Sequence, residues 1–183
     1  MVHFQADTTL CSFNGSVGNR MVSFKVLGQP VPQLRMKFVR GKYIDPSSRL
    51  KGEFCDRTSD VLNHMGIRFR PYFPRNIQVG VRIVYVITRP NYHFEGNDRS
   101  SGVLKQIHSS RHIAHYNRQG DVDNYTKFTL DTISNRMILT DDSQVIHFEA
   151  IKMFEEVNEG GLTSIDVYKW NEDETIQYAP TMG

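Results

Sequence analysis

The stretch IQVGVRIVYVI, residues 77–87, decides the fold of this chain. In a β-strand alternate side chains share a face, and here one such set is entirely apolar: Ile77, Val79, Val81, Ile83, Tyr85 and Ile87. Val84 and Val86 make the second half apolar on both faces, which indicates a central strand. The stretch carries Arg82 and is shorter than the roughly 20 apolar residues that a membrane span needs, so no membrane association is expected.

Weaker patterns on both sides of this strand predict an α+β fold. Residues 21–28 alternate apolar and polar side chains like a strand, which Pro30 and Pro32 then end. The other expected elements are a strand pair over 34–43, a helix from 45–47 to 64, a helix over 124–135, and strands over 144–154 and 165–170. This order favours a mixed sheet with helices packed on it.

Length and composition fit one compact domain. The chain has 183 residues, of which 39% are hydrophobic and 23% are charged. We expect a main domain over 21–155, between an N-terminal extension over 1–20 and a C-terminal extension over 156–183. No signal-peptide pattern begins the chain and its two cysteines form no disulfide framework, so a reducing, cytoplasmic compartment is expected.

Charge is distributed unevenly along the chain. Residues 20–118 contain 18 Lys and Arg against 6 Asp and Glu, whereas residues 119–183 contain 4 against 13. A basic part joined to an acidic part suits a protein that grips a polyanion and holds cations. Solvated basic side chains with acids of the other segment beside them explain the pattern equally, so charge alone leaves nucleic-acid binding open.

The segment GDVDNYTK, residues 120–127, carries the most informative chemistry. Asp121 and Asp123 lie two positions apart, which places both carboxylates on one face of extended backbone. Lys127 follows Asp123 by about one helical turn. If a helix runs away and the chain doubles back as a strand, Asp142 returns to the same place. Such oxygen ligands favour Mg²⁺ or Mn²⁺, which stabilise charge in phosphoryl transfer.

Ordinary structural roles are open for the same residues. Favoured helix N-cap types occur at Asp121, Asp123 and Asn124, and favoured turn types at Asp141, Asp142 and Ser143. Asp141 is therefore either an auxiliary ligand or a solvated turn residue. Lys152 is either a contact to DNA phosphate or an exposed strand lysine.

These motifs resemble the core signature of the RusA-type Holliday junction resolvases. The resemblance rests on DVDNYTK at 121–127, Leu130-Asp131, and DDSQV at 141–145. Supporting pieces follow in the family's order: GQPVPQ at 28–33, YIDP at 43–46, Arg89-Pro90, His93, His115 and Lys152. It covers about residues 21–155. The chain departs from the family at Gly120, where members often have proline.

The resemblance implies a homodimeric, Mg²⁺-dependent endodeoxyribonuclease that nicks four-way DNA junctions in recombination and repair, in a bacterial or phage-infected cell. Asp121, Asp123 and Asp142 match the family's metal-binding carboxylates, and Lys127 matches its essential lysine. Two-fold symmetry suits a junction that needs paired cuts in opposed strands. Two alternatives are a protein that binds branched DNA without cutting it, and a glycosyltransferase whose aspartates hold a metal–nucleotide-sugar complex.

Three further groups of side chains have two interpretations each. His108, His112 and His115 are either zinc ligands or histidines on the surface or facing phosphate. A basic group either tracks a DNA backbone or forms a solvated face: Arg35, Lys37, Arg40 and Lys42. An aromatic group either stacks on unpaired bases or packs in the core and its rim: Tyr43, Tyr72, Phe73, Tyr92 and Tyr116. Cys11 and Cys55 are interpreted as non-catalytic.

Overall fold

The computed structural model describes residues 21–68, 70–109, 120–134, 137–157 and 159–171. Its centre is a four-stranded sheet in the order β1-β6-β4-β5. The strands are β1 (Met21–Leu27), β4 (Val79–Ile87), β5 (Val145–Phe154) and β6 (Leu162–Lys169). β4 pairs in parallel with β5, whereas β6 pairs antiparallel with both β1 and β4. The mixed sheet expected from the sequence is confirmed.

β4 occupies the interior of the sheet, between β6 and β5, as its apolar pattern predicted. The face that carries Val79, Val81 and Ile83 is fully buried. Arg82 points to the other face, where it is exposed and bonds Glu149 on β5 at 2.8 Å. Alternation along one strand therefore identified the core face correctly.

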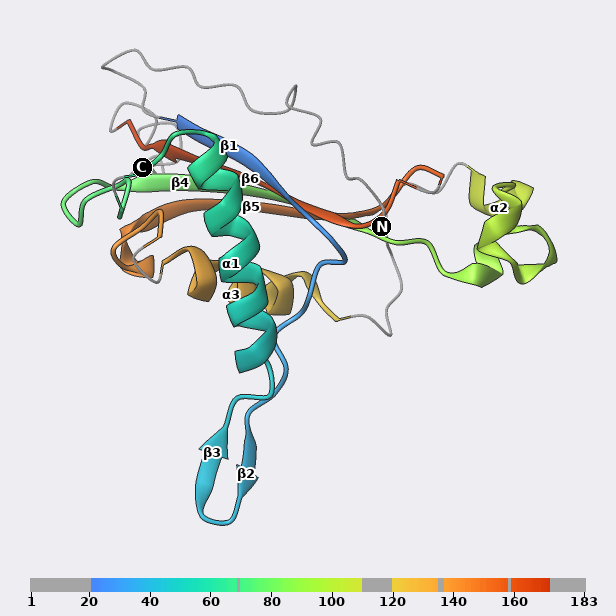
Figure 1. Ribbon diagram of the computed structural model, residues 1–183, viewed down its shortest axis with the longest axis horizontal. Coiled ribbons are helices and arrows are strands. Elements are labelled where there is room, and N and C mark those ends of the chain that lie inside the picture. Colours follow the sequence, from blue (N-terminus) through green and yellow to red (C-terminus); the bar gives the residue numbers. More distant parts are fainter. Residues whose placement is uncertain (1–20, 69, 110–119, 135–136, 158, 172–183) are drawn as a thin grey trace, which may run out of the picture.

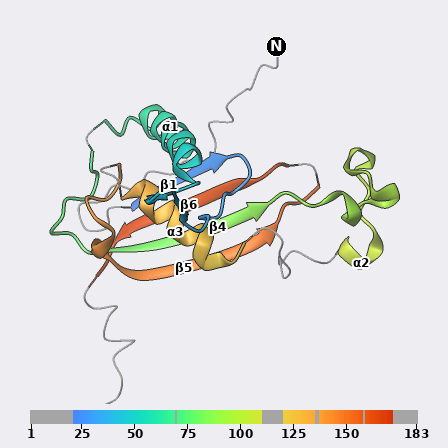
Figure 2. The same cartoon turned by 90° about the horizontal axis from the view of Figure 1, so that it is seen from below.

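Two helices lie on one face of this sheet (Figures 1 and 2), α1 (Ser48–His64) and α3 (Val122–Ile133). Phe54 of α1 meets Phe128 of α3 edge-on, with ring centroids 5.7 Å apart, and Tyr125 of α3 packs on Tyr85 of β4. Both helices were predicted, and α3 begins two residues earlier than its pattern indicated. The core lies between these helices and the sheet.

β6 extends the sheet beyond the expected main domain. The sequence indicated a short strand over 165–170, but the strand is longer and Ile165 lies between Phe24 of β1 and Ile83 of β4. This part of the expected C-terminal extension, 156–183, therefore belongs to the central sheet. The sequence indicated only the second part of this strand, because its pairing with two distant strands leaves no local signal.

Two segments stand away from the sheet. β2 (Lys37–Val39) and β3 (Lys42–Ile44) form the expected strand pair, an antiparallel hairpin that projects from the body (Figure 1). The predicted loop after β4 contains the short turns η2 (Asn91–His93), η3 (Glu95–Asn97) and η4 (Arg99–Ser101), followed by α2 (Gln106–Ser109). A last turn, η5 (Asp142–Gln144), leads into β5. Among the described residues, no helix has the length and apolar character to cross a membrane.

Candidate active site

Asp121 and Asp123 lie at the start of α3, and both are exposed. Asp121 occupies the N-cap position with extended backbone, but its carboxylate accepts no capping hydrogen bond from the described residues. Its main-chain carbonyl instead accepts from the N–H groups of Asn124 and Tyr125. The N-cap interpretation therefore does not account for the Asp121 side chain. The positive end of the helix dipole stabilises two carboxylates at this place.

Gly120 explains why the chain departs from the family's proline here. Its φ of +107° lies in the region that favours glycine, and a Cβ at this position would come within 2.7 Å of Pro32. The N–H of Gln33 donates to the carbonyl of Asn124 at 2.9 Å. The segment GQPVPQ, residues 28–33, is thus packed directly against the turn that carries the two aspartates.

Lys152 lies behind the same turn. It is only 8% exposed, and its Nζ donates to the carbonyl oxygen of Gly120 at 3.1 Å. Burial lowers the pKa of the Lys152 ammonium, and the negative charge of Asp121 acts in the opposite direction. The exposed strand lysine allowed by the sequence is therefore wrong. The sequence predicted the strand β5, but it could not show that the end of this strand meets the start of α3.

Lys127 and two tyrosines complete the surroundings of the α3 start. Lys127 is exposed one turn beyond Asp123, on the same side of the helix. Tyr85 and Tyr125 are buried beneath, and burial raises the pKa of each to about 12. Both hydroxyls therefore stay protonated at neutral pH, which excludes them as general bases there.

Asp142 lies at the opposite end of α3. The helix has 12 residues and is about 18 Å long. Asp142 lies in η5, which leads into β5, whereas Lys152, late in β5, is the residue that reaches Gly120. Figures 1 and 2 show that the two ends of β5 lie far apart along the sheet. Within one subunit, the described residues contain no group of three or more His, Cys, Asp or Glu that could hold a metal.

The expected return of Asp142 to Asp121 and Asp123 is therefore wrong within one subunit. The sequence argument assumed that the returning strand would carry Asp142 back. In the structure the chain reverses after Asp142, so this residue stays at the far end of the helix and the strand returns Lys152 instead.

The turn around Asp142 has a structural framework of its own. The carboxylate of Asp141 accepts from the N–H of Ser143 at 2.9 Å, and this bonding lowers the Asp141 pKa. Gln144 is buried and donates to the carbonyls of Pro74 and Ile77. Of the two interpretations of Asp141, the turn residue is confirmed. Asp142 is exposed on a turn whose position Gln144 holds.

The segment after β4 is tied to the end of β5 by buried charges. Arg89 and Glu155 are fully buried. The main-chain N–H of Arg89 donates to Glu155 Oε1 at 2.8 Å, and the Arg89 guanidinium donates to the Glu155 carbonyl oxygen at 2.7 Å. Arg99 adds an ion pair to Glu155 at 2.8 Å. His108 stacks on His93 with ring centroids 4.0 Å apart, whereas His112 and His115 lie outside the described residues.

The remaining candidates divide between surface and interior. Phe73 is buried with Tyr72 packed on its edge, whereas Tyr43 and Tyr92 are exposed. Cys55 is half-buried, and burial raises the pKa of its thiol, which agrees with a non-catalytic cysteine. Cys11 and Tyr116 lie outside the described residues.

Together these features define a small α+β protein with exposed carboxylates at a helix start backed by a buried ammonium. Residues 28–163 match the family model described as the endodeoxyribonuclease RusA. The match spans more than half of the chain and includes both ends of α3, so the chain belongs to the RusA endodeoxyribonuclease family. The family resemblance seen in the sequence is confirmed. No curated protein matches the chain.

Proposed function

We propose that the chain resolves four-way (Holliday) DNA junctions by metal-dependent hydrolysis of phosphodiester bonds, in recombination and repair. Family membership supports the nuclease activity. The observation that carries the choice of site is the pair of exposed carboxylates, Asp121 and Asp123, at the start of α3. The basic residues of 20–118 supply affinity for DNA, so binding is expected to weaken steeply with salt. The proposed setting is the cytoplasm of a bacterial or phage-infected cell.

The proposed cofactor is Mg²⁺, with Mn²⁺ as a substitute. Asp121 and Asp123 offer hard oxygen donors of the kind these ions prefer, and Asp142 is the proposed third ligand. When bound, the ion supplies electrostatic stabilisation of the charge that develops on the scissile phosphate. Lys127 presents ammonium N–H donors to phosphate oxygens from the same helix face. Lys152 acts as a positioning residue, because it holds the carbonyl immediately before Asp121.

A homodimer supplies the third carboxylate in this proposal. Because the aspartate pair and Asp142 lie at opposite ends of α3, a two-fold axis across the middle of the helix exchanges those ends. Asp142 of the partner subunit then meets Asp121 and Asp123, and the arrangement occurs twice. The edge strand β5 carries exposed apolar side chains that such a contact would cover, among them Ile146 at 46%, Phe148 at 36% and Ile151 at 50% exposure.

A cleavage assay on a synthetic four-way junction tests this function. In Mg²⁺ the chain is expected to nick two opposed strands and to leave a linear duplex of the same sequence intact. Asp121→Asn is expected to bind the junction but to nick it at least about 10²-fold more slowly. An uncut junction in both Mg²⁺ and Mn²⁺, with intact junction binding in EDTA, would instead support a protein that binds branched DNA without cutting it.

A further inference from the structure

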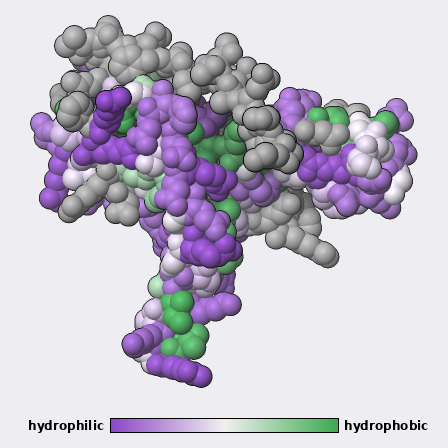
Figure 3. Space-filling view, in the orientation of Figure 1, coloured by the Kyte–Doolittle hydropathy of each residue, from purple (hydrophilic) through white to green (hydrophobic). Residues whose placement is uncertain are grey.

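The β2–β3 hairpin presents an unusual surface for a small protein. All residues from 34 to 44 are exposed, and the hairpin stands clear of the sheet and helices (Figure 1). Apolar and hydrophilic residues lie side by side on it (Figure 3). Phe38 is 65% exposed and Tyr43 is 75% exposed. Apolar side chains gathered on a projecting element mark a binding surface.

The two aromatic rings form one unit. Phe38 and Tyr43 are directly opposite in the strand register, and their ring centroids lie 5.0 Å apart. The turn between the strands has positive φ at both Arg40 and Gly41, which is the geometry of a tight two-residue hairpin. Because that turn sets the register, it also sets the position of the aromatic pair on one face of the hairpin.

The charge of the hairpin identifies the kind of partner. The segment 34–44 contains four basic residues and no acidic one: Arg35, Lys37, Arg40 and Lys42. They form no ion pair with any residue that the structure describes. By strand alternation Lys37 and Lys42 lie on the face opposite to the aromatic pair, so the hairpin presents rings on one face and cations on the other. This suits a nucleic acid, which offers base faces to the rings and phosphates to the cations when the hairpin enters the branch. Two such hairpins repel one another, which disfavours a second copy as the partner.

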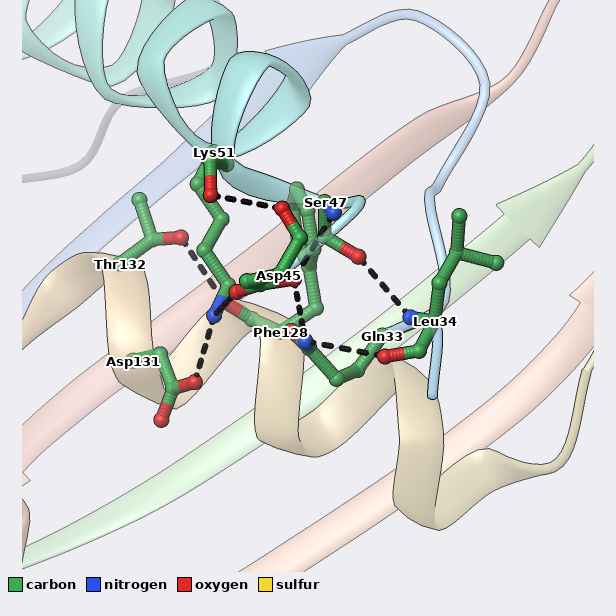
Figure 4. Close-up of polar contacts among 9 residues, drawn as sticks. Gln33, Leu34, Asp45, Ser47, Lys51, Phe128, Asp131 and Thr132 are labelled. Atoms are coloured by element: carbon green, nitrogen blue, oxygen red, sulfur yellow. Dashed lines mark hydrogen bonds and ion pairs between the residues drawn. The ribbon is translucent and has the colours of Figure 1, made fainter. Parts of the chain in front are cut away.

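A half-buried polar network anchors the base of the hairpin (Figure 4). Asp45 accepts hydrogen bonds from the Gln33 side chain at 3.0 Å and from the Ser47 N–H at 2.8 Å. Lys51 of α1 bonds both Asp45 and Asp131 of α3, at 3.0 and 2.8 Å. The network therefore joins the hairpin to both helices.

The same base also touches the candidate active site. The N–H of Gln33 bonds the carbonyl of Asn124 in the first turn of α3, and Pro32 packs on Gly120. The base of the hairpin is thus held next to the turn that carries Asp121 and Asp123, which suits a substrate contact near the proposed cleavage site.

We propose that the β2–β3 hairpin contacts DNA at the branch point, where Phe38 and Tyr43 stack on bases that the branch exposes. Lys37, Arg40 and Lys42 contact the neighbouring phosphates. This inference rests on the proposed function in one respect, that the substrate is branched DNA. Base faces are accessible at a branch and are covered in a continuous duplex, so the aromatic pair distinguishes the two structures.

Binding in EDTA tests the hairpin without any cleavage. The probe is a four-way junction with 2-aminopurine beside the branch point, and the reference is a linear duplex of the same sequence. The wild-type chain is expected to lower the 2-aminopurine fluorescence on binding, because stacking quenches this base. Phe38→Ala/Tyr43→Ala is expected to lose most of that decrease and to bind the junction about tenfold more weakly, with duplex affinity changed by less than about twofold.

Two further variants sharpen the result. Tyr92→Ala removes an exposed aromatic ring outside the hairpin and is expected to behave like the wild type. Lys37→Gln/Lys42→Gln is expected to reduce the slope of log affinity against log salt concentration by the amount expected for about two phosphate contacts. Unchanged fluorescence and junction affinity in Phe38→Ala/Tyr43→Ala would overturn the proposal, and so would an equal loss in Tyr92→Ala.

Sedimentation and cleavage experiments distinguish the hairpin proposal from a subunit contact and from the proposed nuclease function. If Phe38→Ala/Tyr43→Ala dissociates into a smaller species, the hairpin is a subunit contact and the proposal is wrong. If the wild-type chain gives the fluorescence decrease but never nicks in Mg²⁺ or Mn²⁺, the proposed function fails and the hairpin contact is retained. If it nicks junctions without the decrease, the function is retained and the hairpin proposal fails.

Discussion

An aspartate lies near each end of α3, and the two aspartates differ in their hydrogen bonding. At the far end, the carboxylate of Asp141 caps a short turn through the N–H of Ser143. At the start, Asp121 has the N-cap position but makes no capping bond with the described residues. An aspartate bonded by its own turn contributes to structure, whereas one left unbonded is available to a ligand. The comparison separates a structural from a candidate catalytic aspartate where residue type alone could not.

The largest expected effect comes from removing one carboxylate at either end. Asp121→Asn and Asp142→Asn are each expected to lower the rate of junction nicking about 10²–10³-fold, because each removes a charge from the proposed site. Thermal unfolding is expected to stay close to that of the wild type. Asp60→Asn, an exposed aspartate on α1, serves as the control. Full activity of the Asp142→Asn variant would show that the far end of α3 is not part of the active site.

Mixing the two inactive variants tests whether the ends combine across subunits. A mixed dimer of Asp121→Asn and Asp142→Asn contains one site with both carboxylates intact, provided that each site takes Asp142 from the partner subunit. Random mixing is then expected to restore roughly a quarter of the wild-type nicking sites. If every site lies within one subunit, the mixture remains as inactive as each variant alone.

A smaller effect is expected from the ammonium behind the start of α3. Lys152→Met preserves most of the side-chain volume but removes the bond to Gly120 and the charge near Asp121. We expect nicking to fall about tenfold and the Mg²⁺ concentration for half-maximal rate to change. Lys169→Met on β6 removes an exposed strand lysine and is the matched control. A change in unfolding temperature with no change in Mg²⁺ dependence would assign Lys152 a purely structural role.

The far end is expected to matter for stability through Gln144. Gln144→Ala removes the side-chain donor to the Ile77 carbonyl and the acceptor of the Thr140 and Asp141 N–H groups, which is expected to lower the free energy of unfolding by about 1–3 kcal/mol. Denaturant unfolding measures this change. Stability equal to that of the wild type would show that the turn does not depend on Gln144.

The smallest expected effect is a pH dependence from Asp141. Its pKa is lower in the folded chain than in the unfolded chain, because Ser143 bonds the carboxylate. Its stabilisation is therefore present above the unfolded pKa of about 3.9 and is lost as the pH falls through the folded value. Asp141→Asn is expected to be less stable than the wild type at pH 6 and to approach it near pH 2. A difference that persists at pH 2 would contradict this origin.

Local pattern was sufficient for most elements of the fold. Alternation along 77–87 identified a buried strand and its core face, and helical spacing located α1 and α3. The motif at 121–127 identified the family, and its helical spacing placed Asp121 and Asp123 at the start of α3. These predictions succeed because each depends on side chains within a few residues of one another, where backbone geometry dictates the spacing.

The features that only the tertiary structure decided depend on contacts between residues far apart in the chain. The place of β6 between β1 and β4, the burial of Lys152 beneath Gly120, and the separation of Asp142 from Asp121 all belong to this class. The sequence determined which residues are candidates for the chemistry. Only the packed chain decided which of them meet, because the direction in which a strand leaves a turn is settled by its pairing partners and not by its own residues.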